Sequence, residues 1–188
     1  MFQPMFAPNG DLFFVADPEG WWNLYACGPP RAPEAVRAVH TGARELGRPQ
    51  WAFGMRCYGF QDERILATFC EQGGWQLGWI DPSTGTLEPL QTAFAEIDAF
   101  AFAGDDVYIL GGGPDRPLSL ARLDLESGEA CTFRASSSVT LAPEWLSVAE
   151  PVTYPTSEGD EAHGYFYAPR NPLWQAPGEE RPPLIVIG

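Results

Sequence analysis

The sequence has little positive charge and no long apolar run. Eleven basic side chains stand against twenty-five acidic ones, which gives a net charge of -14 over 188 residues. A surface of that sign repels a phosphate backbone, so we expect no binding to nucleic acid. No stretch approaches the roughly 18 uninterrupted apolar residues of a membrane-spanning helix, and residues 1–4 are not a basic region followed by an apolar core. We therefore expect neither a membrane span nor a signal peptide.

Cysteine and histidine are also scarce. The four cysteines are Cys27, Cys57, Cys70 and Cys131, and the two histidines are His40 and His163. The cysteines lack the short spacing that brings two thiolates to one metal ion. We predict reduced thiols in a cytoplasmic protein, with no metal and no cofactor.

What the chain does contain is a hairpin unit repeated about three times. Residues 12–16 and 22–25 align with residues 65–69 and 75–78 at a single offset of 53, so both strands of the hairpin keep their register. A shift of 42 then carries Ile65 to Val107, and a shift of 43 carries residues 75–81 onto 118–124. The first unit is longer because of a proline-rich stretch at 28–50, which indicates a long loop with one short helix.

Each unit contains short apolar and β-branched runs separated by turn residues. We place strands of the second unit near 52–58, 64–70, 75–80 and 86–90, and strands of the third near 97–103, 106–111, 118–124 and 130–133. The turns at 9–10, 81–85 and 124–128 end in the glycine that such turns need. Four strands in every 40 to 50 residues are typical of a β-propeller blade. An all-β sandwich would not require one hairpin register to recur.

Three blades do not close a propeller, which typically uses about four to eight. We therefore expect further blades before residue 1. Unpaired edges of an incomplete propeller favour self-association edge to edge.

After Pro143 the pattern changes to one longer hairpin, with strands at 150–154 and 164–168. A proline-rich connection then leads to an apolar run at 184–187, whose lack of alternation predicts a strand buried on both faces. We expect a domain boundary near residue 145 and a second domain that is cut short. The first domain, 1–145, would hold blades near 1–50, 51–93 and 94–140.

Two stretches of the chain resemble the prolyl oligopeptidase family of serine peptidases, particularly its acylaminoacyl-peptidase and dipeptidyl-aminopeptidase-like branch. The first stretch is residues 6–17 with 20–25, and the second runs from 150–154 through 163–169 to 183–188. The resemblance implies a mainly β fold, in which a partial propeller precedes the first strands of an α/β-hydrolase domain at 146–188. It also implies that the intact enzyme hydrolyses short or N-blocked peptides through an acyl-enzyme, while the propeller gates access.

In that family, a His-Gly-Gly-Pro loop, a G-x-S-x-G elbow, the acid and the histidine all follow the strand that corresponds to 184–188. None of these is present in the 188 residues, so we expect the chain alone to be inactive. The alternative is a non-catalytic propeller that binds a protein or peptide partner, although another blade would then be expected after Pro143.

Four groups of residues resemble functional sites. His163 lies beside Asp160 and Glu161, but by the family's chain order it precedes the nucleophile, so we interpret it as a hairpin residue. Gly111–Gly113 is interpreted as a blade turn because no lysine or helix follows it. Trp21, Trp22, Trp75 and Trp79 recur at equivalent hairpin positions, so we interpret them as packing residues between blades. The acidic turn at 157–161 is interpreted as solvated surface. We assign no catalytic, cofactor-binding or metal-binding residue.

Overall fold

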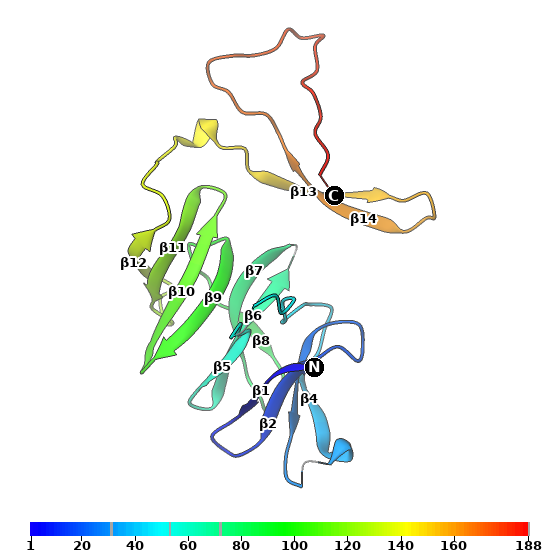
Figure 1. Cartoon of the computed structure of the whole chain (residues 1–188), viewed down its shortest axis with the longest axis vertical. Coiled ribbons are helices and arrows are strands. Elements are labelled where there is room, and N and C mark those ends of the chain that lie inside the picture. Colours follow the sequence, from blue (N-terminus) through cyan, green and yellow to red (C-terminus); the bar gives the residue numbers. More distant parts are fainter. Residues whose placement is uncertain (31, 53, 72, 188) are drawn as a thin grey trace. The chain divides into compact units, whose positions relative to one another are not determined.

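Three sheets of the same construction make up most of the chain, in a computed structural model that describes residues 1–30, 32–52, 54–71 and 73–187 (Figure 1). In each sheet four antiparallel strands lie side by side in chain order. The first sheet contains β1 (Phe2–Phe6), β2 (Leu12–Ala16), β3 (Asn23–Cys27) and β4 (Val36–His40). The second contains β5 (Tyr58–Gln61), β6 (Arg64–Glu71), β7 (Gly74–Ile80) and β8 (Leu87–Pro89). The third contains β9 (Glu96–Ala103), β10 (Asp106–Gly113), β11 (Arg116–Leu123) and β12 (Ala130–Ala135).

The repeat predicted from the sequence is therefore confirmed, and three four-stranded antiparallel sheets in chain order are the arrangement expected of part of a β-propeller. The predicted hairpin offset is also observed, because Val15 pairs with Leu24 in the first sheet and Thr68 pairs with Leu77 in the second. Each pair shifts by 53 residues from one sheet to the next.

Alternating side chains of the central strands build a core on each side of the second sheet. Ile65, Ala67 and Phe69 of β6 belong to the core shared with the first sheet. Leu66, on the opposite face of β6, belongs to the core shared with the third sheet. Burial on both faces explains why β6 is almost continuously apolar, and truncating Phe69 to alanine would cost about 3–5 kcal/mol.

The turn between the third and fourth strands of one sheet packs under the preceding sheet. Gly85 has φ +74°, and a Cβ on it would lie 2.5 Å from the carbonyl oxygen of Val39 at the end of β4. Gly128 takes the same backbone conformation in the third sheet, where a Cβ would overlap the carbonyl oxygen of Gln91. Both the left-handed conformation and the close approach require glycine at these two positions.

Two sequence predictions about the first and second sheets were wrong. The stretch 28–50 was assigned to a long loop with one short helix. The 3-10 turn η1 (Pro33–Ala35) agrees with the helix, but the stretch also contains β4. The first strand of the second sheet was placed at 52–58, whereas β5 begins at Tyr58. Phe53, inside that predicted strand, lies outside the described residues.

The misplaced strand has a structural cause, which is an insertion. Two strand pairs of the second sheet have equivalents in the third. The pair Glu45–Cys70 corresponds to Glu96–Gly112. The pair Phe60–Ile65 corresponds to Phe102–Val107. The path from Glu45 to Phe60 is nine residues longer than the equivalent path from Glu96 to Phe102. We call residues 47–56 the inserted loop.

Thr68 of β6 joins the two ends of the inserted loop. Its hydroxyl oxygen lies 3.2 Å from the carbonyl oxygens of both Leu46 and Cys57, and its backbone N–H donates to Cys57 at 2.7 Å. Gln3 of β1 adds a second anchor, because its side-chain oxygen accepts from the N–H of Cys57 at 2.7 Å. Its side-chain nitrogen donates to the carbonyl of Tyr58, also at 2.7 Å.

The chain divides into two compact units, one of Met1–Gly113 with Leu118–Ser136, the other of Pro114–Pro117 with the residues from Ser137 onward. The second unit contains the 3-10 turn η2 (Pro143–Trp145) and a hairpin of β13 (Ala149–Pro155) and β14 (Glu161–Tyr167), as predicted. Within the described ranges, no helix is long and apolar enough to cross a membrane.

The strand predicted at 184–187 is not observed. Leu184, Ile185, Val186 and Ile187 belong to no strand, and they are 75–89% exposed. Buried strands of a parallel sheet depend on neighbouring strands for their backbone hydrogen bonds, and no described segment pairs with this one. Gly188 lies outside the described residues.

Candidate functional site

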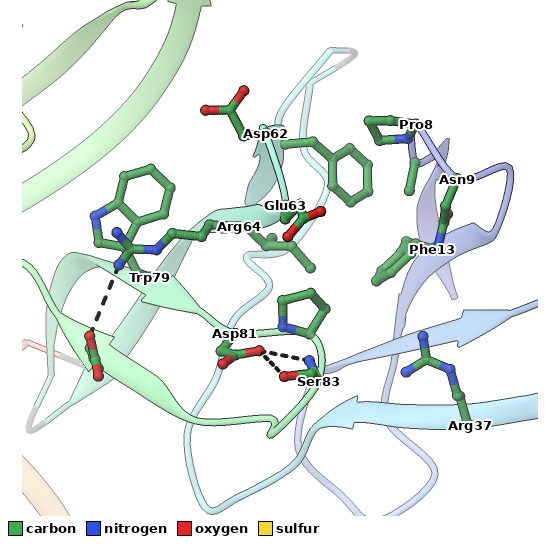
Figure 2. A pocket seen from close by; sticks show the side chains of 15 residues that line it. Pro8, Asn9, Phe13, Arg37, Asp62, Glu63, Arg64, Trp79, Asp81 and Ser83 are labelled. Carbon is green, nitrogen blue, oxygen red and sulfur yellow. Dashed lines mark hydrogen bonds and ion pairs between the residues drawn. The ribbon is translucent and has the colours of Figure 1, made fainter.

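A cavity of about 980 Å³ lies between the first and second sheets (Figure 2). Phe13 and Phe60, in edge-to-face contact with ring centroids 5.1 Å apart, form part of its apolar wall. Arg64 lies over the ring of Trp79, 4.3 Å from the centroid, and its nearest carboxylate is Glu88 at 4.0 Å. Acidic residues outnumber the two arginines of the lining, Arg37 and Arg64.

The hydroxyl of Ser83 lines this cavity and lies beside the carboxylate of Asp81. It donates to Asp81 Oδ1 at 2.6 Å, and its backbone N–H donates to the same oxygen at 2.8 Å. Those hydrogen bonds, the one from the hydroxyl first, hold the pKa of Asp81 below its ordinary value, so this carboxylate is a weak base. Asp124 and Ser127 repeat the arrangement in the third sheet. The pair is therefore a recurring turn element rather than an activated nucleophile.

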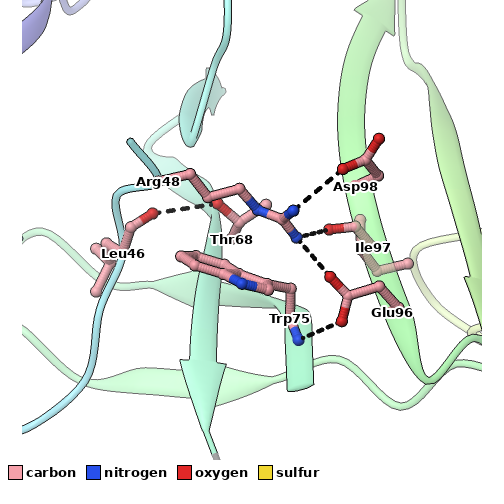
Figure 3. Close-up of polar contacts among 7 residues, drawn as sticks. All are labelled: Leu46, Arg48, Thr68, Trp75, Glu96, Ile97 and Asp98. Carbon is pink, nitrogen blue, oxygen red and sulfur yellow. Dashed lines mark hydrogen bonds and ion pairs between the residues drawn. The ribbon is translucent and has the colours of Figure 1, made fainter. Parts of the chain in front are cut away.

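Arg48, at the start of the inserted loop, connects the second and third sheets (Figure 3). Its guanidinium donates to Glu96 at 2.9 Å, to Asp98 at 3.1 Å and to the carbonyl of Ile97 at 2.7 Å. It also stacks on Trp75, with Cζ 4.2 Å from the ring centroid. Glu96 also accepts a hydrogen bond from the backbone N–H of Trp75 at 3.0 Å, which closes the network. The Arg48 guanidinium makes one charge-assisted hydrogen bond to each of Glu96, Asp98 and Ile97.

The same carboxylate contact occurs one sheet earlier. Glu45 accepts the backbone N–H of Trp22 at 2.8 Å, and Trp22 and Trp75 are equivalent positions of the repeat. Each carboxylate lies where the chain enters the next sheet, Glu45 before β5 and Glu96 at the first residue of β9. The predicted packing role is observed for Trp22, Trp75 and the buried Trp79, whereas Trp21 is 41% exposed.

A second cavity of about 430 Å³ lies between the inserted loop and β9. The loop contributes Arg48, Trp51, Met55 and Arg56, and β9 contributes residues 98–101. Cys57 at its base is buried, and desolvation raises the pKa of that thiol to about 12. Cys57 is thus a protonated core thiol and not a nucleophile at neutral pH.

The two histidines take no part in either cavity. His163 lies opposite Thr153 in the second-unit hairpin, and its Nδ1 is 3.0 Å from the Thr153 hydroxyl. No described carboxylate forms an ion pair with His163, so the predicted hairpin role agrees with the structure. Within the described ranges, no group of three or more His, Cys, Asp or Glu side chains converges to hold a metal ion.

The prediction that Gly111–Gly113 is a turn was wrong. These residues end β10, and a Cβ on Gly111 would lie 3.0 Å from the ring of Phe94. Close packing of an aromatic ring against the strand accounts for this glycine.

Sequence analysis did not single out Arg48, Trp51 or Arg56. Their role depends on the inserted loop, and the loop is visible only once Glu45 and Phe60 are known to pair with β6. The one available signal was the excess length between the first two hairpins.

Several solved peptidase structures are similar to the chain. A puromycin hydrolase aligns with 96% of it at a TM-score of 0.83 and 28% identity. A puromycin-hydrolyzing peptidase from Mycobacterium tuberculosis aligns with 97% of it at a TM-score of 0.87 and 28% identity. A prolyl endopeptidase aligns with 84% of the chain at a TM-score of 0.61 and 11% identity, which is a likeness of fold alone. The chain covers 23% of that protein.

No protein-family model and no curated protein matches the chain. The chain spans 27% of the puromycin hydrolase and 28% of the M. tuberculosis peptidase. Its structural neighbours are thus puromycin hydrolases and prolyl oligopeptidases, and the resemblance found in the sequence is confirmed. The three sheets correspond to the propeller region of peptidases of the prolyl oligopeptidase family.

Proposed function

We propose that the chain is part of a cytoplasmic serine peptidase of the prolyl oligopeptidase family that hydrolyses short or N-blocked peptides. The observation that carries the proposal is the 28% identity to two puromycin-hydrolysing proteins over 96% and 97% of the chain. The alignment includes residues of both compact units, so it is not limited to a generic propeller hairpin. The four unpaired cysteines are in keeping with a reducing compartment.

In this proposal residues 1–145 form part of the propeller and residues 146–188 begin the hydrolase domain. The propeller supplies no reacting group. It limits which peptides reach the active site, so that small or unfolded chains enter and folded proteins do not. The β13–β14 hairpin leads into the hydrolase sheet, where residues 184–187 gain the strand partners that they lack among the described residues.

The chemistry itself would depend on residues outside 1–188. A serine in a G-x-S-x-G elbow forms the acyl-enzyme, a histidine acts as general base, and an acidic residue orients the histidine. No G-x-S-x-G occurs in the 188 residues.

The test is to read the coding sequence on both sides of residues 1–188 in the native source and to express the whole product. We expect a His-Gly-Gly-Pro type loop and then G-x-S-x-G after Gly188. The product should hydrolyse aminoacyl and N-acylaminoacyl nitroanilides, and the names of the relatives make puromycin a third substrate to assay.

Two controls accompany this assay. Replacing the elbow serine by alanine should abolish hydrolysis, and residues 1–188 alone should not exceed a blank. A native stop codon directly after Gly188, or hydrolysis by residues 1–188 alone, would overturn the proposal. The stop codon would instead favour a non-catalytic interaction module.

A further inference from the structure

The cavity between the inserted loop and β9 differs from its neighbours in charge. Its lining holds two arginines, Arg48 and Arg56, and a single carboxylate, Asp98. The cavity between the first two sheets has four carboxylates against two arginines, and a third cavity near Asp105 and Asp124 has only Arg64 against five carboxylates. Because Arg48 is shared between the carboxylates of Asp98 and Glu96, Arg56 is the cation of this cavity that could attract an anionic ligand.

The two arginines of this cavity have different roles. Arg48 is 19% exposed, and it bonds Glu96, Asp98 and the carbonyl of Ile97 (Figure 3). Arg48 is therefore shared between two carboxylates and is not available to an anionic ligand. Arg56 is exposed, and no described residue forms an ion pair or a hydrogen bond with its guanidinium. Its five N–H donors are available to a ligand.

Apolar side chains line the same cavity as Arg56. They include Met55, the buried Phe100 and Trp51, which is 89% exposed. An exposed aromatic ring and an arginine in one cavity suit a ligand with a flat or apolar group near its negative charge. A volume of about 430 Å³ is sufficient for one or two amino-acid residues.

The inserted loop is anchored well enough to hold such a site. Thr68 bonds both of its ends, Gln3 bonds Cys57, and Arg48 fixes its first turn on β9. A loop anchored at both ends loses less conformational entropy when a ligand binds.

We propose that this cavity binds a short peptide through a free carboxylate, with Arg56 as the partner of the carboxylate and Trp51 against the adjacent side chain. Arginine and carboxylate can form two parallel N–H···O bonds, a geometry that a neutral amide cannot match. That the ligand is a peptide rests on the proposed function, whereas the preference for a carboxylate rests on the charges and partners of the cavity alone.

The test uses calorimetry on the full 188-residue chain with three N-acetylated dipeptides. The first is N-acetyl-alanyl-phenylalanine with a free terminal carboxylate, and the second is its uncharged carboxamide. The third, N-acetyl-glutamyl-phenylalanine carboxamide, carries only a side-chain carboxylate. We expect at least one carboxylate peptide to bind at least tenfold more tightly than the uncharged one, and the tighter of the two identifies the source of the carboxylate.

Variants then locate the binding. Arg56→Gln should weaken the carboxylate peptide at least tenfold while leaving the uncharged peptide unchanged, and Trp51→Ala should weaken both. Arg134→Gln is the matched control, because Arg134 is an exposed arginine on β12, outside the cavity, and should have no effect. Arg56 and Trp51 are exposed, so their loss should leave the circular dichroism spectrum and the unfolding midpoint unchanged.

Equal binding of all three peptides, absence of binding, or an Arg56→Gln variant that binds as the parent does would each overturn the proposal. These outcomes are separate from failure of the proposed function. Hydrolysis by the whole product without carboxylate preference in residues 1–188 would remove this site alone. Carboxylate binding by residues 1–188 with no hydrolysis by the whole product would remove the peptidase function and leave the site.

Discussion

His40 Nδ1 lies 2.8 Å from the carbonyl oxygen of Gly85 and joins the outermost strand of the first sheet to a turn of the second. A carbonyl oxygen only accepts hydrogen bonds, so Nδ1 is the nitrogen that carries the ring proton. The contact lies beside the close approach of Gly85 to Val39, and the two together fix where the second sheet meets the first.

Gly85→Ala should destabilise the protein more than Gly10→Ala. Both glycines have positive φ, +74° and +86°, so both variants incur a strain of about 1–2 kcal/mol. Gly10 has open space around it, whereas a Cβ on Gly85 meets the Val39 carbonyl at 2.5 Å, which adds at least about 1 kcal/mol. Urea unfolding of the two variants measures the difference, and equal midpoints would show that the close approach carries no energetic weight.

Arg48→Met should lower the free energy of unfolding by about 1–3 kcal/mol. It removes one donor each from Glu96, Asp98 and the Ile97 carbonyl while keeping an apolar stem over Trp75. The control is Arg64→Met. Arg64 also stacks on a tryptophan, but it is 53% exposed and 4.0 Å from its carboxylate, so its loss should cost less than about 1 kcal/mol. If both variants lost the same stability, the Arg48 network would be no more than a surface ion pair.

Thr68→Val should loosen the inserted loop. It removes the single hydroxyl proton that the buried carbonyls of Leu46 and Cys57 share, whereas Cys57 keeps the bond from the Thr68 backbone N–H. A loss of about 1 kcal/mol corresponds to a roughly fivefold larger open population. Trypsin cleavage after the exposed Arg56 should accelerate by that factor, while Thr68→Ser, which keeps the hydroxyl, should be cleaved at the parent rate.

The four thiols should react in an order set by exposure. At pH 8 a disulfide reagent should modify the exposed Cys131 first and the buried Cys27 and Cys57 only after unfolding. Cys131→Ser should remove the fast phase. The half-buried Cys70 should react at an intermediate rate, so a fast phase that persists when both Cys131 and Cys70 are replaced by serine would contradict the burial of Cys27 and Cys57.

Cys57 also links stability to alkaline pH. Burial raises its pKa from 9.0 to about 12, so the unfolded chain loses the thiol proton at lower pH than the folded one does. The stabilisation is present in full below pH 9 and is lost as pH rises toward 12. Cys57→Ser removes this titration, so its unfolding free energy should fall less steeply than that of the parent over the same range. Parallel pH profiles would show that the Cys57 pKa is the same in both states.

The third sheet could be predicted almost completely from the sequence, and the start of the second could not. The predicted strands 97–103, 106–111, 118–124 and 130–133 differ from β9–β12 by no more than two residues at either end, because regular alternation and glycine turns define them locally. The residues before Tyr58 include tryptophan, methionine and cysteine, which look like a strand. What makes them a loop is distant: Thr68, Gln3 and Asp98 bond its two ends from β6, β1 and β9.

The candidate site was hidden for the same reason. Nothing near Arg56 in the sequence distinguishes it from the other arginines, because its importance lies in having no acidic partner in three dimensions. The apolar run at 184–187 shows a different limit of sequence analysis. Its pattern predicts a buried strand, but no described strand covers it, and its residues are exposed.

The bond between Glu45 and the N–H of Trp22 has a consequence for the order in which the protein is made. Glu45 follows Trp22 by 23 residues and belongs to the connection into the second sheet. On a ribosome that adds about 5–20 residues per second, the first hairpin therefore waits roughly 1–5 s for a carboxylate from the next sheet. The same delay recurs between Trp75 and Glu96, 21 residues apart. The first and second sheets each gain this contact only after part of the next sheet has been made, so the two contacts form in order from the N-terminal side.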